Sequence, residues 1–386
     1  MGDALAEGAA TRAEIALWLL KDRFPDWELA LIGVSESHSA LEALWHGVDE
    51  RHPLHSHSSS RAAAESVHKV YRAIDRLIGT LAEEFQDATI LVFSMHGMGE
   101  NRSDVPGMVL LPELLYRHAF GRSFFEQQNS WTRAANGLPI LGKEETWNVV
   151  TPDVTWMALG ERLVRRARGQ AAKFLPKQVK QTLKRMLQHR PQKGEIGSQR
   201  QRNVVEEAID RRRKSLEWMP AARYQPLWSK MRAFALPSFH DGQIRLNLQG
   251  RERKGIVPLE RYKICCEEII QILRDCKDPL SGQPTVDKID TPHYGDPLGL
   301  TASQADMYVA WKKNVLCLEH PRLGRVGPVP FLRTGGHTGL YGMAYLKPEH
   351  VVSGDYGKRS SFDVVPTLFH VLGERLPDKM SGQSLV

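Results

Sequence analysis

Three histidines follow apolar runs of the sequence and stand beside polar residues or glycines. His38 is followed four residues later by Glu42, and glycines lie next to His96 and His337. If the segment that holds His38 and Glu42 is helical, both side chains lie on the same face. Imidazole and carboxylate ligands suit zinc, manganese or iron, and a catalytic zinc site usually has three protein ligands and one open position. We therefore predict a metal site made of His38, Glu42 and His337.

Each histidine taken alone has a simpler interpretation, because a lone histidine more often caps a turn or completes a hydrogen bond in the core. Their shared position favours a site. All three come after segments with the pattern of strands, and ligands of open α/β sheets bind at the carboxyl ends of strands.

Hydrophobic periodicity predicts the elements that must position these residues. Apolar residues recur at helical spacing in 11–24 and 67–81, whereas 27–34 and 88–93 are continuous apolar runs typical of buried parallel strands. This alternation predicts an α/β fold built of βαβ units. Further strands are expected at 231–239, 242–248 and 307–311, and further helices at 259–274 and 363–372.

The strand pattern fades between residues 101 and 220, which favours a mostly helical insertion. We therefore expect three parts: 1–100 as the N-terminal part of the α/β core with the metal-site loops, 101–225 as a helical basic insertion or cap, and 226–386 as the C-terminal part of the core. Residues 191–202 are rich in Gln, Gly, Ser and charge, which predicts a mobile stretch.

The excess of positive charge belongs to one segment of the insertion. The chain has 52 Lys and Arg against 45 Asp and Glu, a net charge of +7. Residues 161–214 alone carry +12, so the rest of the chain carries −5. Such a segment could bind nucleic acid or an acidic membrane surface through phosphates. Phe174 is its only aromatic residue, which disfavours a stacking platform. We favour a helical cap that attracts small anionic substrates.

Four cysteines are present without a C-x-x-C pair, which disfavours a disulfide framework and a thiolate zinc site. We expect a reducing compartment. The first residues lack the basic region of a signal peptide, and no apolar run has the roughly 18 residues of a membrane span. The sequence therefore predicts a soluble, cytoplasmic protein.

Two glycine-rich segments and the end of the chain resemble a known family. Residues 94–99, S-M-H-G-M-G, resemble the S-D-H-G-M motif of the alkaline phosphatase superfamily, in particular its type I phosphodiesterase and nucleotide pyrophosphatase branch. Residues 336–339, G-H-T-G, resemble the late metal-binding motif of that branch. Residues 361–373 and 380–385 are similar to its D-x-x-P-T-x-x-x-L-L-G run and its M-x-G-x-S-L ending. The resemblance covers residues 14–110 and 230–386.

The resemblance implies a three-layer αβα sandwich and a two-metal hydrolase of phosphate esters. It places the first metal on His38, Glu42 and His337, although this chain has His then Glu where the family has Asp then His. It places the second metal at His96, where Met95 replaces the family's Asp. Zinc is the first expectation and manganese the second.

The family's nucleophile is a Ser or Thr at a helix N-terminus that follows an Asp-Gly strand end. No such arrangement occurs before Leu31, so we expect the catalytic nucleophile outside this chain. The chain is then either a shortened hydrolase or a non-catalytic relative that binds an anionic ligand or regulates. A sulfatase or a phosphomonoesterase is a further alternative.

Several other polar residues are candidates for supporting roles. Asn101 and Arg333 could bind a phosphoryl oxygen, since an arginine fork matches phosphate geometry. Residues 240–242 predict a hairpin turn between the strands at 231–239 and 242–248. One loop is rich in histidines that could bind a metal or transfer protons near neutral pH. We favour a solvated loop without a specific role. These histidines are His46, His52, His55 and His57.

Overall fold

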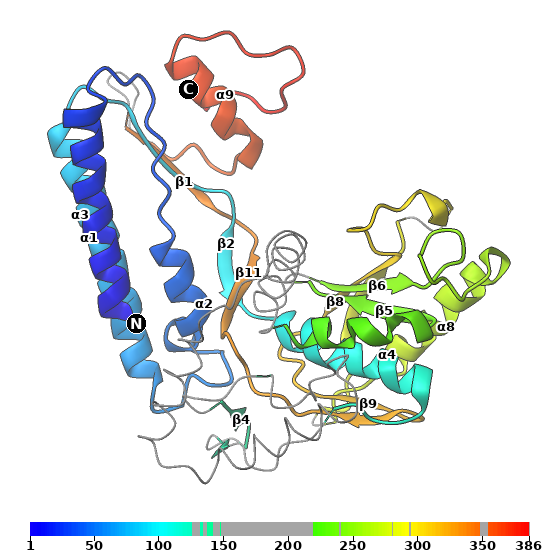
Figure 1. Cartoon of the computed structure of the whole chain (residues 1–386). Coiled ribbons are helices and arrows are strands. Elements are labelled where there is room, and N and C mark those ends of the chain that lie inside the picture. The colour runs from blue at the N-terminus through cyan, green and yellow to red at the C-terminus, as the bar shows by residue number, and fades with distance from the viewer. Residues whose placement is uncertain are drawn as a thin grey trace, which may run out of the picture.

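The computed structural model describes residues 1–125, 132–133, 137–141, 147, 219–238, 241–279, 281–292, 295–347 and 354–385. The basic segment 161–214, the stretch 191–202 and the greater part of the predicted insertion lie outside these residues. The described chain forms two lobes (Figure 1). We call residues 1–100 and 335–385 the site lobe, and the described residues of 101–334 the sheet lobe.

Helices form one side of the site lobe. They are α1 (Gly2–Trp18), continued by a π-helical turn at Leu19–Arg23, α2 (Glu36–Val48) and α3 (Ser60–Glu84). Helix α1 buries a stripe of alanines, among them Ala9 and Ala13, against α3, whose buried face includes Val70 and Leu77. Small side chains at helical spacing let the two helix axes approach closely. The helices predicted at 11–24 and 67–81 are therefore confirmed, and both are longer than predicted.

The strand predicted at 27–34 is wrong. These residues follow the first helix without forming a strand, and among the described residues no ladder partner lies beside them. The side chain of Leu31 is 73% exposed, whereas Trp27 packs edge-on against Phe85 at 5.4 Å between ring centroids. An apolar run becomes a strand only where a neighbouring strand satisfies its backbone groups, and here it instead packs one aromatic ring against the residue that ends α3.

Two short antiparallel ladders form the other side of the site lobe (Figure 1). Strand β1 (Ile90–Ser94) pairs with β12 (Met343–Lys347), and β2 (Gly97–Glu100) pairs with β11 (Gly335–Gly339). Glu100 lies directly opposite Gly335. The chain therefore leaves the site lobe after Glu100 and, after the whole sheet lobe, returns at Gly335 beside the residue where it left.

The sheet lobe contains a four-stranded antiparallel sheet in the order β5-β6-β8-β7. Its strands are β5 (Ala233–Leu236), β6 (Gly242–Leu246), β7 (Val286–Asp290) and β8 (Met307–Trp311). Its longer helices are α4 (Leu111–Phe120), preceded by a π-helical turn at Pro106–Leu110, the 3-10 helix Pro220–Lys230, and α8 (Tyr262–Arg274), preceded by a 3-10 turn at Leu259–Arg261. The large buried core of the described chain belongs mainly to this lobe.

The remaining elements are short. They are the pair β3 (Thr132–Arg133) and β4 (Pro139–Ile140), the pair β9 (Leu318–His320) and β10 (Gly324–Val326), the 3-10 turns Pro297–Gly299 and Ser361–Asp363, and helix α9 (Val364–Val371). The strands predicted at 231–239 and 242–248 and the helix predicted at 363–372 are confirmed with shorter bounds. The strand predicted at 307–311 has the predicted bounds, and residues 259–274 are helical throughout, as predicted.

The chain is a mixed α and β protein, but its strands pair differently from the expectation. Every ladder between described strands is antiparallel, and the parallel contact between Leu248 and Val257 is a single bridge. The alternation of helix and strand predicted parallel pairing, which these ladders do not show. Strands β5 and β6 pair as a hairpin, as residues 240–242 predict, although 239–240 lie outside the described residues.

The closing motif has a structural role in the fold. Asp363 accepts a hydrogen bond from the backbone N–H of Gln383 at 2.9 Å and one from that of Ser360 at 3.1 Å. The hydroxyl of Thr367 donates to the carbonyl of Asp363 and accepts from the N–H of Leu385. The Asp and Thr of this motif therefore tie the last residues of the chain to α9.

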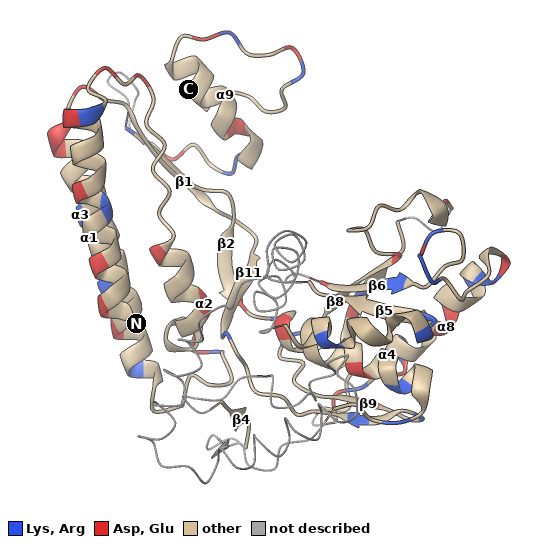
Figure 2. Ribbon diagram, in the orientation of Figure 1, with Lys and Arg blue, Asp and Glu red and all other residues tan. Residues whose placement is uncertain are grey.

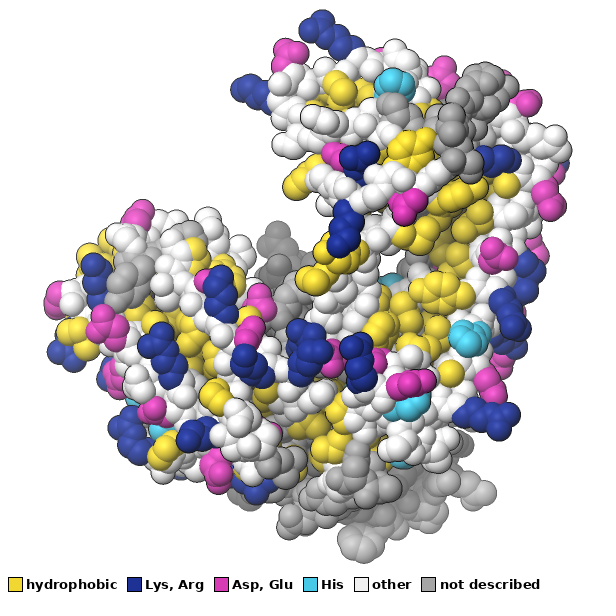
Figure 3. Space-filling model, turned by 180° about the vertical axis from the view of Figure 1, so that it is seen from behind, with side chains coloured by type: hydrophobic (Ala, Val, Ile, Leu, Met, Phe, Trp, Pro, Cys, Tyr) yellow, Lys and Arg dark blue, Asp and Glu magenta, His cyan; other side chains and the backbone are white. Residues whose placement is uncertain are grey.

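Charged and hydrophobic side chains are distributed differently over the surface. Acidic and basic residues are interspersed along the described helices, without a face of one sign (Figure 2). Hydrophobic side chains gather on the site lobe (Figure 3), where Phe93, Met343 and Tyr345 of the β1–β12 pair are exposed. None of the described helices is long and apolar enough to cross a membrane.

Candidate metal centre

Helix α2 presents the first two predicted ligands on one face. The helix begins at Glu36, so His38 and Glu42 are one turn apart, as the i, i+4 spacing requires. His38 Nε2 lies 3.5 Å from Glu42 Oε1. The helical geometry on which the predicted pair depends is therefore present.

The third predicted ligand, His337, lies in a β-bulge of strand β11. Gly336 pairs with Gly99 and Gly339 pairs with Gly97, so His337 and Thr338 together lie opposite one residue of β2. Bulges re-aim side chains and are frequent beside active sites. The bulge is pinned by the Thr338 hydroxyl, which donates to the carbonyl of Glu100 at 2.8 Å.

Strand β11 lies close against α2 because residue 335 is a glycine. A Cβ built on Gly335 would collide with the carbonyl oxygen of Leu41 on α2. Only glycine permits this approach. The contact brings the strand that carries His337 against the helix that carries His38 and Glu42.

Three donor atoms converge as a result. His38 Nε2 lies 2.9 Å from His337 Nε2, and His337 Nε2 lies 3.7 Å from Glu42 Oε1. With the 3.5 Å between His38 and Glu42, these distances bracket the separation of about 3.3 Å between neighbouring ligands of tetrahedral zinc. The three residues form the candidate metal-binding group among the described residues. The donor set and its spacing therefore fit one divalent ion.

Solvent reaches one side of this group. The side chains of His38, His337 and Glu42 are 42%, 27% and 17% exposed. A site of three protein ligands open on one side leaves room for a substrate or a water molecule.

Arg333 contacts the same oxygen of Glu42 that faces His38 and His337. Its guanidinium contacts Glu42 Oε1 through Nη1 and binds Asp104 through Nε at 2.7 Å and Nη2 at 2.9 Å. Burial lowers the pKa of Arg333, but the carboxylates of Asp104 and Glu42 outweigh it and raise that pKa above its usual value. Arg333 is thus a permanent cation that orients Glu42. Its predicted contact with substrate stays a prediction.

Asn101 is buried at the junction of the two lobes. Its amide Nδ2 donates to the carbonyl of Gly335 at 3.1 Å, and its Oδ1 accepts from the N–H of Asp104 at 3.0 Å. Both polar ends thus hold the start of β11 and the residues that follow β2. Its predicted role in substrate binding is also left as a prediction.

His96 approaches the centre from a different direction. It lies between β1 and β2, and its Nε2 is 3.1 Å from Nδ1 of His337, the ring nitrogen that is remote from Glu42. Its own Nδ1 is 3.0 Å from the carbonyl of Gly97. The neighbouring Met95 is 52% exposed. His96 therefore contacts His337, and it is not one of the three residues whose donor atoms converge.

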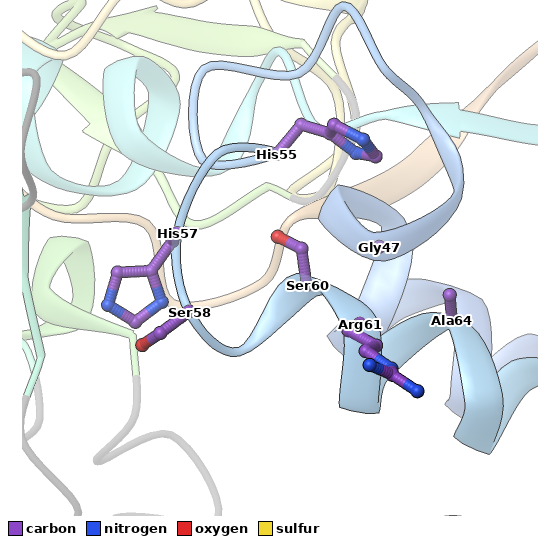
Figure 4. Close-up of a pocket in the computed structure, with 7 residues that line it drawn as sticks. All are labelled: Gly47, His55, His57, Ser58, Ser60, Arg61 and Ala64. Carbon is purple, nitrogen blue, oxygen red and sulfur yellow. The ribbon is translucent and has the colours of Figure 1, made fainter.

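The histidine-rich loop forms a pocket beside α2 and α3. A cavity of about 380 Å³ is lined by Gly47, His55, His57, Ser58, Ser60, Arg61 and Ala64 (Figure 4). The expectation of a solvated loop is wrong for His46 and His52, which are 8% and 3% exposed. Burial lowers the pKa of both, and that of His52 falls to about 4.

Sequence reasoning missed the residues that connect this loop to the centre. The hydroxyl of Thr334 donates to the carbonyl of Ala43, and the oxygen of that hydroxyl lies 3.2 Å from His46 Nδ1. Asp104, which holds Arg333, was also not foreseen. No local pattern marks these residues, because each acts on a partner more than 200 residues away in the sequence.

Comparisons of the chain with family models, with curated proteins and with solved structures found no match in any of the three.

Proposed function

We propose that this chain is a metal-dependent hydrolase of phosphate esters with an alkaline phosphatase-like core, and that zinc is its metal. The observation that carries the proposal is the convergence of His38 Nε2, Glu42 Oε1 and His337 Nε2 at ligand spacing. Support for the alkaline phosphatase-like arrangement comes from the ligand segments and the closing motif rather than from the strand pairing.

The chemistry proposed for the centre follows from the ion that its residues would hold. His38, Glu42 and His337 would hold the ion, and Arg333 orients Glu42 through its contact with Oε1. A divalent ion there would supply Lewis acidity toward a phosphoryl oxygen and lower the pKa of a bound water. We assign no nucleophile, because the hydroxyls of Thr334 and Thr338 already donate to backbone carbonyls.

The compartment is also part of the proposal. All four cysteines are free and buried: Cys265, Cys266, Cys276 and Cys317. Thiols that form no disulfide suit a reducing, cytoplasmic environment.

The second candidate function is a metal-binding relative without turnover. Met95 favours it, because a thioether is a poor ligand for a hard or borderline cation and replaces the carboxylate that the family's second metal needs.

Zinc titration by calorimetry tests the site, with His337→Ala as the variant and His370→Ala, an exposed histidine on α9, as the matched control. We expect wild type and His370→Ala to bind zinc equally. His337→Ala should bind on the order of 100-fold more weakly, because one of three ligands is lost. Equal binding by His337→Ala and wild type, or no binding by wild type, contradicts the site.

Hydrolysis of bis(4-nitrophenyl) phosphate with and without zinc then separates the two functions. Zinc-dependent release of nitrophenol that His337→Ala abolishes supports the hydrolase. Zinc binding without any release of nitrophenol supports the relative without turnover.

A further inference from the structure

The ring of His96 is placed to control the ring of His337. Its Nε2 lies 3.1 Å from His337 Nδ1, and the two ring centroids are 4.7 Å apart with the planes tilted by 57°. The short connection between β1 and β2 holds His96 in this position, on the side of His337 away from Glu42.

The backbone determines which nitrogen of His96 carries the proton. The carbonyl of Gly97 can only accept a hydrogen bond, so His96 Nδ1, at 3.0 Å, must be the N–H that donates to it. A neutral imidazole has one N–H, so His96 Nε2 carries a lone pair and accepts.

The same reasoning determines which nitrogen of His337 carries the proton. Because His96 Nε2 accepts, His337 Nδ1 must donate. The neutral ring of His337 then has its lone pair on Nε2, the atom that lies 2.9 Å from His38 Nε2 and 3.7 Å from Glu42 Oε1. This is the tautomer in which His337 can bind a metal ion through Nε2.

We propose that His96 is a positioning residue that fixes the tautomer and orientation of His337, and that the centre holds one metal ion rather than two. The inference rests on the proposed metal site. Histidines that bind metals commonly donate their other ring N–H to an acceptor, and loss of that acceptor typically weakens metal binding about 10- to 100-fold.

The surroundings of His96 agree with a single ion. A second ion on His96 would need further donors, and Met95 offers a thioether beside it. Among the described residues, His38, Glu42 and His337 are the one group of three or more metal-ligating side chains. His96 Nε2 is also already turned toward His337 Nδ1.

Zinc titration of three proteins tests the proposal: wild type, His96→Ala, which removes the acceptor, and His96→Gln, whose amide oxygen can accept from His337 Nδ1. We expect one zinc per chain in all three. His96→Ala should bind zinc about 10- to 100-fold more weakly than wild type, and His96→Gln should recover the larger part of that loss. Thermal unfolding in a chelator verifies that the variants fold.

Nitrogen-15 chemical shifts of the metal-free protein read the tautomer directly. We expect the Nδ1–H form of His337 in wild type and in His96→Gln, and a mixture of tautomers in His96→Ala. A merely structural role of His96 would not change this signature.

The outcomes separate this inference from the proposed function. Two zinc ions in wild type that fall to one in His96→Ala would make His96 a ligand and overturn the inference alone. Equal affinity of His96→Ala and wild type, or failure of His96→Gln to recover binding, would also overturn it and leave the metal site standing. Absence of zinc binding by wild type would overturn both.

Discussion

At the scale of single residues, four of the described histidines form two pairs with different surroundings. His38 and His337 are partly exposed, and their Nε2 atoms face each other at 2.9 Å. His46 and His52 are buried, and burial lowers the pKa of both. The first pair suits metal binding, and the second pair links stability to pH.

His52 makes the folded state sensitive to acid. Its Nδ1 accepts from the N–H of Leu54, while its Nε2 is buried without a partner among the described residues, beside the ring of Phe331. Burial and the nearby His46 lower its pKa to about 4, against 6.5 for an ordinary histidine. The unfolded chain therefore takes up this proton at a higher pH than the folded chain does.

Acid should consequently destabilise wild type more than the variant His52→Leu. As pH falls from 6.5 to 4, His52 should cost the folded state about 3 kcal/mol of unfolding free energy. Urea unfolding at several pH values measures this, with the exposed His68→Leu as the matched control. If wild type, His52→Leu and His68→Leu lose equal stability over this range, His52 does not titrate as argued.

At the scale of elements, periodic patterns predicted well and glycine-rich segments did not. The i, i+4 spacing of His38 and Glu42 anticipated their common face on α2, and helix α8 and strands β5, β6 and β8 follow their apolar patterns. Strands β2 and β11 have five glycines in nine residues and little strand propensity, so sequence indicated loops. They form strands because they pair with each other.

The wrong prediction of parallel pairing and the wrong prediction of a strand at 27–34 have a common cause. Hydrophobic pattern records which side chains avoid water, but the partner of a strand depends on contacts far along the chain. Ser94 of β1 pairs with Met343, and no local feature of either segment predicts the other as its partner.

Gly335→Ala tests the close approach of β11 and α2. The new methyl group would collide with the carbonyl of Leu41, so the strand must move away from the helix that carries His38 and Glu42. We expect zinc affinity to fall at least about tenfold, since a small misplacement spreads the ligands. Gly79→Ala in α3 is the control, because nothing lies within 4 Å of its new Cβ.

The control variant Gly79→Ala should affect stability rather than zinc binding. Gly79→Ala should leave zinc binding unchanged and raise stability by roughly 0.5–1 kcal/mol, because alanine is the better helix former. Calorimetric titration and urea unfolding measure the two effects. Unchanged zinc affinity in Gly335→Ala would show that the contact with Leu41 does not determine the geometry of the centre.

At the scale of the whole molecule, the candidate centre joins distant parts of the chain within the lobe that has the smaller core. The main hydrophobic cluster lies mainly in the sheet lobe, whereas the second cluster, in the site lobe, consists of Ala6, Ala9 and Ala73 with Ile74 packed against it. An ion shared by α2 and β11 would therefore connect two elements of the lobe with the smaller core. Charge was the weakest guide at this scale, since the basic segment 161–214 lies outside the described residues.

Zinc should accordingly raise the thermal midpoint of wild type. A ligand at 100 times its dissociation constant stabilises the state that binds it by about 2.7 kcal/mol, which corresponds to a rise of a few degrees. Differential scanning fluorimetry with zinc and with excess chelator measures the shift. His38→Ala should show little or none of it, and a shift of equal size in that variant would place the ion elsewhere.

The pairing of Glu100 with Gly335 also sets an order of events during synthesis. After the first 100 residues have left the ribosome, the nascent chain holds His38, Glu42 and His96 but has neither β11 nor His337. Because His337 follows the sheet lobe in the sequence, His38, Glu42 and His337 can converge only after the entire sheet lobe has been made. A metal ion would therefore meet all three proposed ligands only after β11 has been made, and until then the glycine-rich strand β2 lacks its partner strand.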